Sequence, residues 1–498
     1  MQNVESTTYS PTIASSTIRH ANTAAKYLVG AFVALTAGCL ALGAAGMLRL
    51  AYPVLAVAVA GYLFARSKPT YVGFTCWIWF LSPLVRRLVD FKGGWQEEST
   101  ILLAPYLVTA VSGLDLLTHL RSLGRARSIP FVLAFAAVGY GVVVGFTKYS
   151  LVQMAPAILN WIVPLCFAFF LVESHPDYQA IRRSFESTFL IATFLIGVYG
   201  IYQFFFLPPW DKLWLENVKT TTFGVAEPME LRGFSTMNAP VIFALTMMAT
   251  LLVVLGLRSK FRFIAGTCGL LSLILSFNRS AWLGFVAGAL FVVWKMGARE
   301  RTRVVFAFIV CALLSPVLLV VPGVKDLITE KMETMANPAQ DVSYQARIEG
   351  YQNAFAMLAH EPFGEGVGSP DIDHNTMEND DAIGPHDSLI LELLYSLGWC
   401  GTAFYLAGVG LVTWRAFARS ATNHPFETSM KAVLVAFFAQ CLLNDVVYGG
   451  VGFFFWSAGA MQLAAIAHAE KESPAEPAQS SSTVESAAPF AMRGEAGL

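Results

Sequence analysis

The chain has 498 residues, of which 55% are hydrophobic and only 13% are charged. Soluble proteins carry about 25% charged residues, so these charges are too few to coat the several soluble domains that the length would otherwise suggest. The 33 Lys and Arg residues nearly balance the 34 Asp and Glu residues, at a net charge of -1, which gives a nucleic-acid-binding function no electrostatic support. The composition predicts an all-α, polytopic transmembrane helical bundle.

Long apolar blocks give fourteen candidate membrane spans, because a helix needs about 20 mostly apolar residues to cross a bilayer. Some blocks are short, so we expect about 12–14 spans. The candidates are residues 27–48, 51–65, 71–85, 101–117, 130–147, 154–172, 188–206, 239–257, 263–277, 281–294, 304–321, 388–414, 429–448 and 451–468.

Lys and Arg concentrate in alternate loops, which predicts the orientation, since cytoplasmic loops carry the excess of basic residues. Basic clusters such as Arg258, Lys260 and Arg262 place those loops inside, whereas Arg86 and Arg87 fall in a short outer loop. The predicted division is a cytoplasmic tail (1–26), membrane helices (27–206), a periplasmic loop (207–238), membrane helices (239–321), a large periplasmic catalytic loop (322–387), membrane helices (388–468) and a disordered cytoplasmic tail (469–498).

Three arginines occupy the predicted outer side. Arg232 directly precedes a span, Arg279 sits in a tight turn between two spans, and Arg347 lies in the large loop. A single interfacial arginine is explained by its side chain reaching the headgroup region. Three on one side fit convergence on an anionic group, because guanidinium binds phosphate oxygens in a bidentate manner.

His386 lies at the outer mouth of the span that follows the large loop. It is either a helix-capping histidine or a general base, since imidazole titrates near neutral pH. Glu392, six residues later, lies inside an apolar run, where a carboxylate is costly and suggests a function. It would orient His386 or pair with an arginine of a neighbouring helix.

Other polar patterns are weaker. Residues 371–382 lack the glycine and the terminal carboxylate of a calcium loop, so we expect a solvated acidic loop. The glycines of 364–368 predict a turn rather than a nucleotide-binding loop, and the cysteines form no thiolate metal cluster. The main polar residues within spans show no path across the bilayer, which counts against an ion-coupled transporter; they are Asp115, Asn160, Gln203, Asn444 and Asp445.

Four segments within about residues 230–405 form a recognisable set. They are Arg232-Gly233 ahead of Asn238; Ser276 to Gly284; Arg347, Tyr351 and Ala354 with Pro362 to Gly368; and His386-Asp387-Ser388-Leu389 with Gly398 and Gly401. Together these segments resemble the superfamily of O-antigen ligases and Wzy polymerases, glycosyltransferases of the bacterial envelope. Asp387 stands where the family usually has Asn, and the family usually has Trp near Tyr351.

This resemblance implies a GT-C-like membrane fold and transfer of a glycan from an undecaprenyl-diphosphate-linked donor, without a metal or other cofactor. It implies that Arg279 and Arg347 hold the diphosphate with help from Arg232, and that His386 deprotonates the acceptor hydroxyl. Asp387 and Glu392 are candidate supporting residues. The implied partners are the lipid-linked oligosaccharide, a glycan acceptor, the bilayer and other polysaccharide-assembly proteins.

We therefore predict a multi-pass enzyme of the bacterial inner membrane whose active site faces the periplasm. The outer loops reveal no lipid A or protein acceptor, which favours a polymerase of O-antigen or exopolysaccharide. The alternatives are a ligase that transfers to lipid A core or a protein, a polysaccharide transporter or flippase, and a membrane scaffold without catalysis.

Overall fold

A computed structural model describes residues 11–218, 221–314, 351–352, 355–356, 360–368, 388–419 and 424–472. Within these ranges the chain is helical, and its one β-bridge joins Gly224 to Leu231. The prediction of an all-α, polytopic membrane protein is confirmed. The bounds of the main helices are α1 (Pro11–Ala41), α2 (Ala45–Arg66), α3 (Lys68–Gly93), α4 (Ala104–Ala110), α5 (Gly113–Thr118), α6 (Ile129–Phe146), α7 (Leu151–Glu173), α8 (Tyr178–Phe206), α9 (Pro209–Asn217), α10 (Pro240–Gly256), α11 (Phe261–Ile274), α12 (Arg279–Lys295), α13 (Ala298–Leu314), α16 (Leu389–Ala418), α17 (Pro425–Phe438) and α18 (Gly449–Glu472).

In the described part of the chain, nine helices are long and apolar enough to cross a membrane, and α10 and α11 are shorter apolar helices. Each of the fourteen candidate spans overlaps a helix, but some boundaries differ. The first break comes at Gly43, whose φ of 78° a glycine adopts without strain, rather than near residue 50. Helix α17 ends at Phe438 instead of continuing to residue 448. The division into tails and loops remains a prediction.

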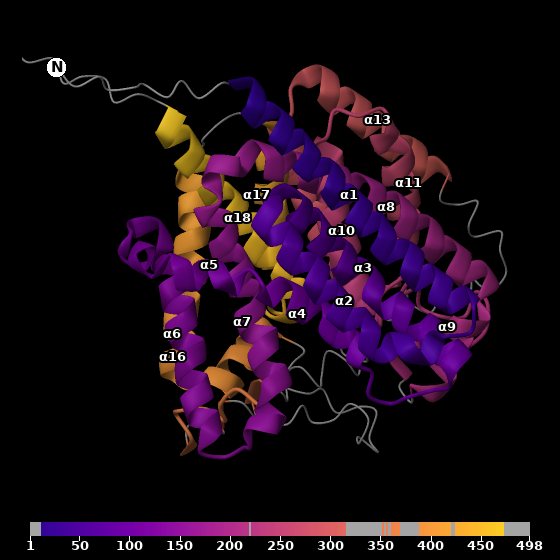
Figure 1. Cartoon of the computed structure of the whole chain (residues 1–498), viewed down its shortest axis with the longest axis horizontal. Helices are drawn as coiled ribbons and strands as arrows, with labels where there is room; N and C mark the ends of the chain where they lie inside the picture. The colour runs from indigo at the N-terminus through magenta and orange to yellow at the C-terminus, as the bar shows by residue number, and fades with distance from the viewer. Residues whose placement is uncertain are drawn as a thin grey trace, which may run out of the picture.

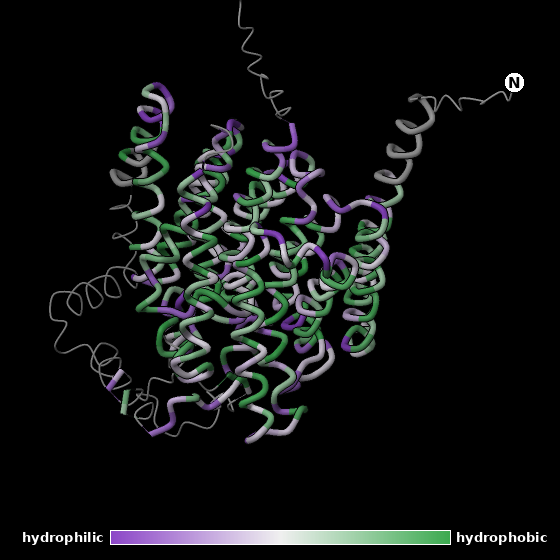
Figure 2. The backbone as a smooth tube through the Cα atoms, turned by 90° about the vertical axis from the view of Figure 1, so that its left-hand side faces the viewer, coloured by the Kyte–Doolittle hydropathy of each residue, from purple (hydrophilic) through white to green (hydrophobic). Residues whose placement is uncertain are grey.

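The helices pack as one bundle in which α18 is the central element, since 89% of its most apolar window is buried by protein. Helix α7 packs on α18, α6 packs on α16, and α8 packs on α11 (Figure 1). Hydrophobic colour dominates the helices, and the hydrophilic segments gather mainly near their ends (Figure 2). This distribution is the one a bilayer requires, because polar groups are costly in its hydrocarbon core.

The bundle has two polar ends, which we name after two arginines. The hairpin of α11 and α12 runs from one end to the other. Its turn carries Arg279, and the opposite ends of the two helices lie beside Arg258. The 17 residues of α12 span about 25 Å. The Arg279 end also receives the segment after α8, and the prediction from basic residues places this end in the periplasm.

Residues 361–368 form the predicted glycine-rich turn, and this turn packs between α6 and α16. Its glycines adopt positive φ, 79° at Gly364 and 89° at Gly366, which other residues rarely adopt. The backbone N–H of Val367 donates to the Gly141 carbonyl of α6 at 2.9 Å. On the other side, Gly364 packs against Gly398, where α16 is kinked. The turn therefore needs glycine for both its dihedral angles and its close approach.

An exposed ionic contact fastens the same turn to the end of α6. The Lys148 ammonium lies 2.8 Å from Glu361 and 3.0 Å from Glu365. Burial alone would lower the pKa of Lys148, but the hydrogen bonds that its ammonium donates to both carboxylates raise this pKa. The Lys148 hydrogen bond is the main cause that lowers the pKa of Glu361. Residues 361–368 lie within the large loop that the sequence predicts to be catalytic, ahead of His386. The Lys148 contact therefore anchors this part of the loop to the end of α6.

Replacing Gly366 by Ala should destabilise the protein. A Cβ atom there would lie 2.3 Å from the Gly145 nitrogen, and Ala is strained at this φ. We expect a loss of about 1–3 kcal/mol, measured by thermal unfolding of the purified protein. Gly266→Ala is the matched control, because its Cβ meets no atom within 4 Å in helix α11. Equal stability of the two variants would contradict the packing described here.

Candidate functional site

The turn that carries Arg279 is built by its own short polar side chains. Phe277 is buried and has a φ of 50°, which lets the chain reverse between α11 and α12. The Asn278 side chain caps α12 by accepting from the Ala281 N–H at 2.9 Å. Ser280 Oγ also donates to Asn278 Oδ1, at 2.7 Å. These bonds make Arg279 the first residue of α12.

This position is unfavourable for a cation. The N-terminus of a helix carries partial positive charge. A basic residue there destabilises the helix, whereas an anion stabilises it. Arg279 is half-buried at this N-terminus. A guanidinium beside a helix N-terminus forms an anion site in which both groups attract the same ligand. The local geometry of Arg279 is therefore suited to a phosphate-bearing ligand.

Arg232 contacts the same turn from a segment more than 40 residues upstream. Its Nη2 donates to the Phe277 carbonyl at 3.2 Å, and its Nη1 donates to the Thr222 carbonyl at 3.2 Å. The next residue, Gly233, donates its N–H to the Leu275 carbonyl at 2.9 Å. A Cβ on Gly233 would lie 3.0 Å from that carbonyl oxygen, so the close approach requires glycine. Two of the predicted diphosphate-binding residues are thus on adjoining segments.

A buried ion pair holds the segment that carries Arg232. Arg87 of α3 and Asp211 of α9 are both almost fully buried, and Arg87 Nη1 lies 2.5 Å from Asp211 Oδ1. Arg87 Nη2 donates to the Ser235 carbonyl at 2.6 Å, and the guanidinium lies 4.8 Å from the centre of the Phe234 ring. Arg87 of this pair therefore contacts the ring of Phe234 and the backbone carbonyl of Ser235, two and three residues after Arg232.

Gln203 of α8 completes this buried network. Its Oε1 accepts the Phe234 and Ser235 N–H groups at 3.0 and 2.6 Å, and its Nε2 donates to Asp211 Oδ2 at 2.7 Å. Tyr199 donates to the same carboxylate oxygen at 2.8 Å. A buried ion pair is costly unless further hydrogen bonds satisfy both partners. Those bonds are present here, and they hold Ser235 at a φ of 47°.

The start of α16 joins the Arg279 turn through the irregular segment after α17. Asn444 Nδ2 donates to Ser280 Oγ at 2.8 Å, next to Arg279. The Leu389 N–H donates to the carbonyls of Cys441 and Asn444, at 3.0 and 3.2 Å. This segment thus bridges the first residues of α12 and α16. Irregular backbone at this depth is tolerated because surrounding protein satisfies its polar groups.

Two further motif residues meet at the same place. Tyr351 and Ser388 share a hydrogen bond of 2.6 Å between their hydroxyl oxygens. Tyr351 lies four residues after Arg347, and Ser388 lies two residues after His386. Arg347, His386 and Asp387 themselves are outside the described residues, as are Ala354 and the acidic segment 371–382. The structure therefore brings together Arg232, Arg279 and the described neighbours of the other predicted site residues.

Glu392 is buried, with 2% of its surface exposed, in the first turn of α16. Its Oε1 accepts a hydrogen bond of 2.7 Å from Ser396 Oγ, one turn further along the same helix. A carboxylate satisfied by a neighbouring hydroxyl stabilises the helix that carries Ser388. Its proposed role in supporting His386 remains a prediction.

Arg87 corrects the sequence analysis, which placed it in an exposed outer loop. It is instead inside α3 with 1% of its surface exposed, because Asp211 and the Ser235 carbonyl satisfy it there. Gln203 and Asn444 were noted as polar residues within spans but received no role. Their hydrogen bonds to distant segments could be found only from the tertiary structure.

The hydrogen-bonding groups gathered at the Arg279 end come mostly from arginine, asparagine, serine and backbone. In the residues that the structure describes, no group of three His, Cys, Asp or Glu side chains could hold a metal ion. The chemistry available from Arg232 and Arg279 is attraction and orientation of an anion.

Comparison with known families agrees with this geometry. Residues 264–406 match a family model described as O-antigen ligase. The match includes Arg279, Arg347 and His386 and the hydrogen-bonded residues Tyr351 and Ser388, whereas Arg232 lies upstream of it. No curated protein matches the chain. The recognition based on four motifs is thereby confirmed.

Loss of one partner of the Arg87–Asp211 pair should destabilise the protein far more than loss of both. Arg87→Met leaves a buried carboxylate without its cation, which costs about 3–5 kcal/mol. Replacing both residues, as Arg87→Met with Asp211→Leu, removes both charges and should recover most of that loss. Thermal unfolding of the three purified proteins measures the difference. A double variant as unstable as the single one would show that packing, not charge, dominates.

Proposed function

We propose, from the match of residues 264–406 to the O-antigen ligase family model, that the chain transfers a glycan from an undecaprenyl-diphosphate-linked donor to a glycan acceptor. We place this reaction at the periplasmic face of the bacterial inner membrane. Within the family we favour a polymerase that extends O-antigen or exopolysaccharide. The acceptor is then a second lipid-linked glycan.

One observation carries the proposal. The segments of Arg232, Arg279, Tyr351 and Ser388 are joined by side-chain and backbone hydrogen bonds at one end of the bundle, although they lie up to 156 residues apart. That end receives a lipid-linked donor laterally, because its isoprenoid chain stays in the bilayer while its diphosphate lies near the headgroups.

The reaction follows from the charges that it moves. The acceptor hydroxyl oxygen forms a bond to the anomeric carbon of the donor glycan as the bond from that carbon to the diphosphate oxygen breaks. Undecaprenyl diphosphate leaves with the bonding electron pair, so negative charge grows on it. Guanidinium groups directed at the developing charge stabilise the transition state. Arg279, Arg347 and Arg232 are the residues proposed for this role.

His386 is the proposed general base, which takes the proton from the acceptor hydroxyl. In the chain His386 is two residues before Ser388, and Ser388 hydrogen-bonds to Tyr351, which follows Arg347 by four residues. This supports a base and a diphosphate clamp at one place. Asp387 and Glu392 are proposed as supports for the histidine.

The ligase reaction is the second candidate, because the matching family model is described as O-antigen ligase. Its donor and its leaving group are the same. It differs only in the acceptor, which would be lipid A core or a protein. The proposed clamp and base serve both reactions, so the acceptor must be found by experiment.

Arg279 should be essential for transfer but not for folding. We expect Arg279→Ala to reduce the transfer rate by about 10²–10³-fold, the loss typical of one missing transition-state donor. Arg279→Lys should restore only part of it, because lysine lacks the bidentate geometry. Transfer with lipid-linked oligosaccharide is the measurement. Lys92→Ala, an exposed charge at the end of α3, is the control. Activity of Arg279→Ala and Arg347→Ala equal to wild type would favour a structural scaffold.

His386→Ala separates the transferase from a flippase. The variant should insert normally, lose glycan transfer and accumulate lipid-linked substrate on the outer leaflet. Leaflet-specific labelling of the lipid-linked glycan gives the answer. Accumulation confined to the cytoplasmic leaflet would contradict the transferase and support a flippase.

The products distinguish polymerase from ligase. Purified protein mixed with lipid-linked repeat units should yield longer lipid-linked chains if it is a polymerase. A parallel reaction contains lipid A core in addition to the protein and the lipid-linked repeat units. Transfer of glycan to that core, without lengthening of the lipid-linked chains, would establish the ligase instead.

A further inference from the structure

A basic pocket lies at the Arg258 end, opposite the proposed transfer site. It has a volume of about 160 Å³, far more than the roughly 15 Å³ that one water molecule needs. The ends of α10 and α12 and the starts of α11, α13 and α17 surround it. Its lining includes three cationic residues, Arg258, Arg262 and Lys295, and one carboxylate, Glu300. The pocket is therefore positively charged.

The Glu300 carboxylate already pairs with Arg262 and Arg303. The positive charges of Arg258 and Lys295 are therefore not balanced by this carboxylate. Glu300 Oε2 lies 2.6 Å from Arg262, and its Oε1 lies 2.8 Å from Arg303. The Arg262 hydrogen bond is the main cause that lowers the pKa of Glu300. Both oxygens of this carboxylate contact an arginine. Arg262 also donates to the Leu257 carbonyl, which fixes it to the wall of the pocket.

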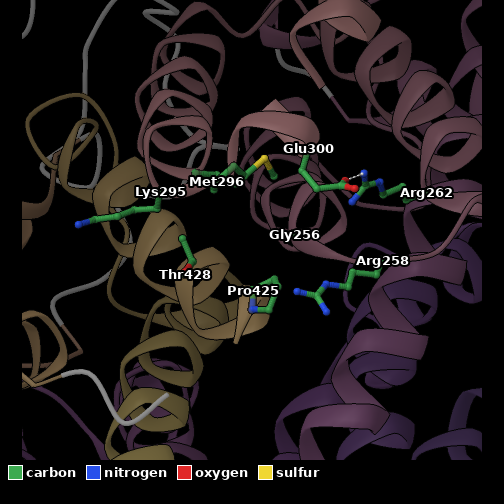
Figure 3. Close-up of a pocket in the computed structure, with 10 residues that line it drawn as sticks. Gly256, Arg258, Arg262, Lys295, Met296, Glu300, Pro425 and Thr428 are labelled. Atoms are coloured by element: carbon green, nitrogen blue, oxygen red, sulfur yellow. Dashed lines mark hydrogen bonds and ion pairs between the residues drawn. The ribbon is translucent and has the colours of Figure 1, made fainter. Parts of the chain in front are cut away.

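Arg258 is the cation directed into this space. Figure 3 shows its side chain extending toward Pro425, while Arg262 and Glu300 face each other nearby. Lys295 turns outward, and its ammonium lies 4.1 Å from the centre of the Trp294 ring. A cation–π contact at an exposed site is weak, so the flexible lysine can turn to an anion at the pocket rim.

Further charged residues lie beside the pocket. The pKa of His424, which begins α17 beside the pocket, is lowered by burial and then by the charges of Arg182 and Arg258. The nearby carboxylate of Glu186 lies 3.7 Å from Arg182. Gly256 lets α17 close the pocket, since a Cβ there would lie 2.9 Å from the Pro425 carbonyl oxygen.

We propose that this pocket binds a phosphate group, through Arg258 with Lys295 at its rim. An arginine in a cavity pairs with phosphate oxygens in a bidentate manner, and lysine adds a point charge. Basic pockets between transmembrane helices at the cytoplasmic surface are suited to phospholipid headgroups. An anionic phospholipid headgroup and a free phosphate share this chemistry. The inference is independent of the proposed glycan transfer.

The test measures binding by the purified full-length protein in zwitterionic detergent. The probe is a fluorescent short-chain phosphatidylglycerol, and phosphatidylcholine of equal chain length is the probe without net charge. We expect the variant with Arg258→Gln and Lys295→Gln to bind phosphatidylglycerol at least about tenfold more weakly, which corresponds to about 1.4 kcal/mol. Lys260→Gln is the matched control, because it removes an exposed charge from the same loop without lining the pocket.

Inorganic phosphate, added at constant ionic strength, distinguishes the two sources. Displacement of the probe by millimolar phosphate means that the phosphate group alone is recognised. Binding that persists, yet still requires Arg258, means that the site needs a lipid headgroup. Arg258→Lys keeps the charge and should keep most of the binding, which tests the site if the neutral variant unfolds. Equal binding by the double variant and wild type, or of both lipids by wild type, would overturn the proposal.

Discussion

The buried ion pair between Arg87 and Asp211 is the interaction on which the Arg279 end depends. Two charges removed from water must be satisfied almost completely, and the groups that satisfy them come from α3, α8, α9 and the segment after Phe223. The pair therefore fixes Ser235 relative to three helices. Since Arg232 lies only three residues upstream and also bonds to the Phe277 carbonyl, its position follows from the same constraint.

A second chain of hydrogen bonds relates this arrangement to the remaining motifs. Asn444 joins Ser280 to the segment that also receives the Leu389 N–H, and Ser388 meets Tyr351. Each bond connects elements that no local sequence pattern brings together. The family match begins at residue 264 and so omits Arg232, but the structure attaches Arg232 to the matched region directly. The two polar ends of the α11–α12 hairpin thus each carry arginines, Arg232 and Arg279 at one end and Arg258 and Arg262 at the other.

Much of the fold could be predicted from the sequence, because each membrane span requires a long apolar run that hydropathy detects. Each of the fourteen candidate blocks overlaps a helix in the described chain, although several boundaries differ. The errors share one cause. Arg87 was assigned to a loop since a charge inside a span is costly, and the hydrogen bonds that lower this cost come from Asp211 and Ser235, distant in sequence. Helix α17 ends at Phe438, and in the segment that follows Asn444 donates to Ser280 of α12, a contact that hydropathy does not detect.

The sequence by itself determined the class of protein, the approximate spans, the resemblance to the family that residues 264–406 match, and which arginines to propose as diphosphate ligands. Composition and motif order suffice for these, because they depend on local patterns. Only the tertiary structure decided that Arg232 and Arg279 share one turn, that Arg87 is a buried support, and that Arg258 faces a pocket. The physical reason is that a buried charge is stable only where partners from several helices surround it, and those partners are adjacent only after folding.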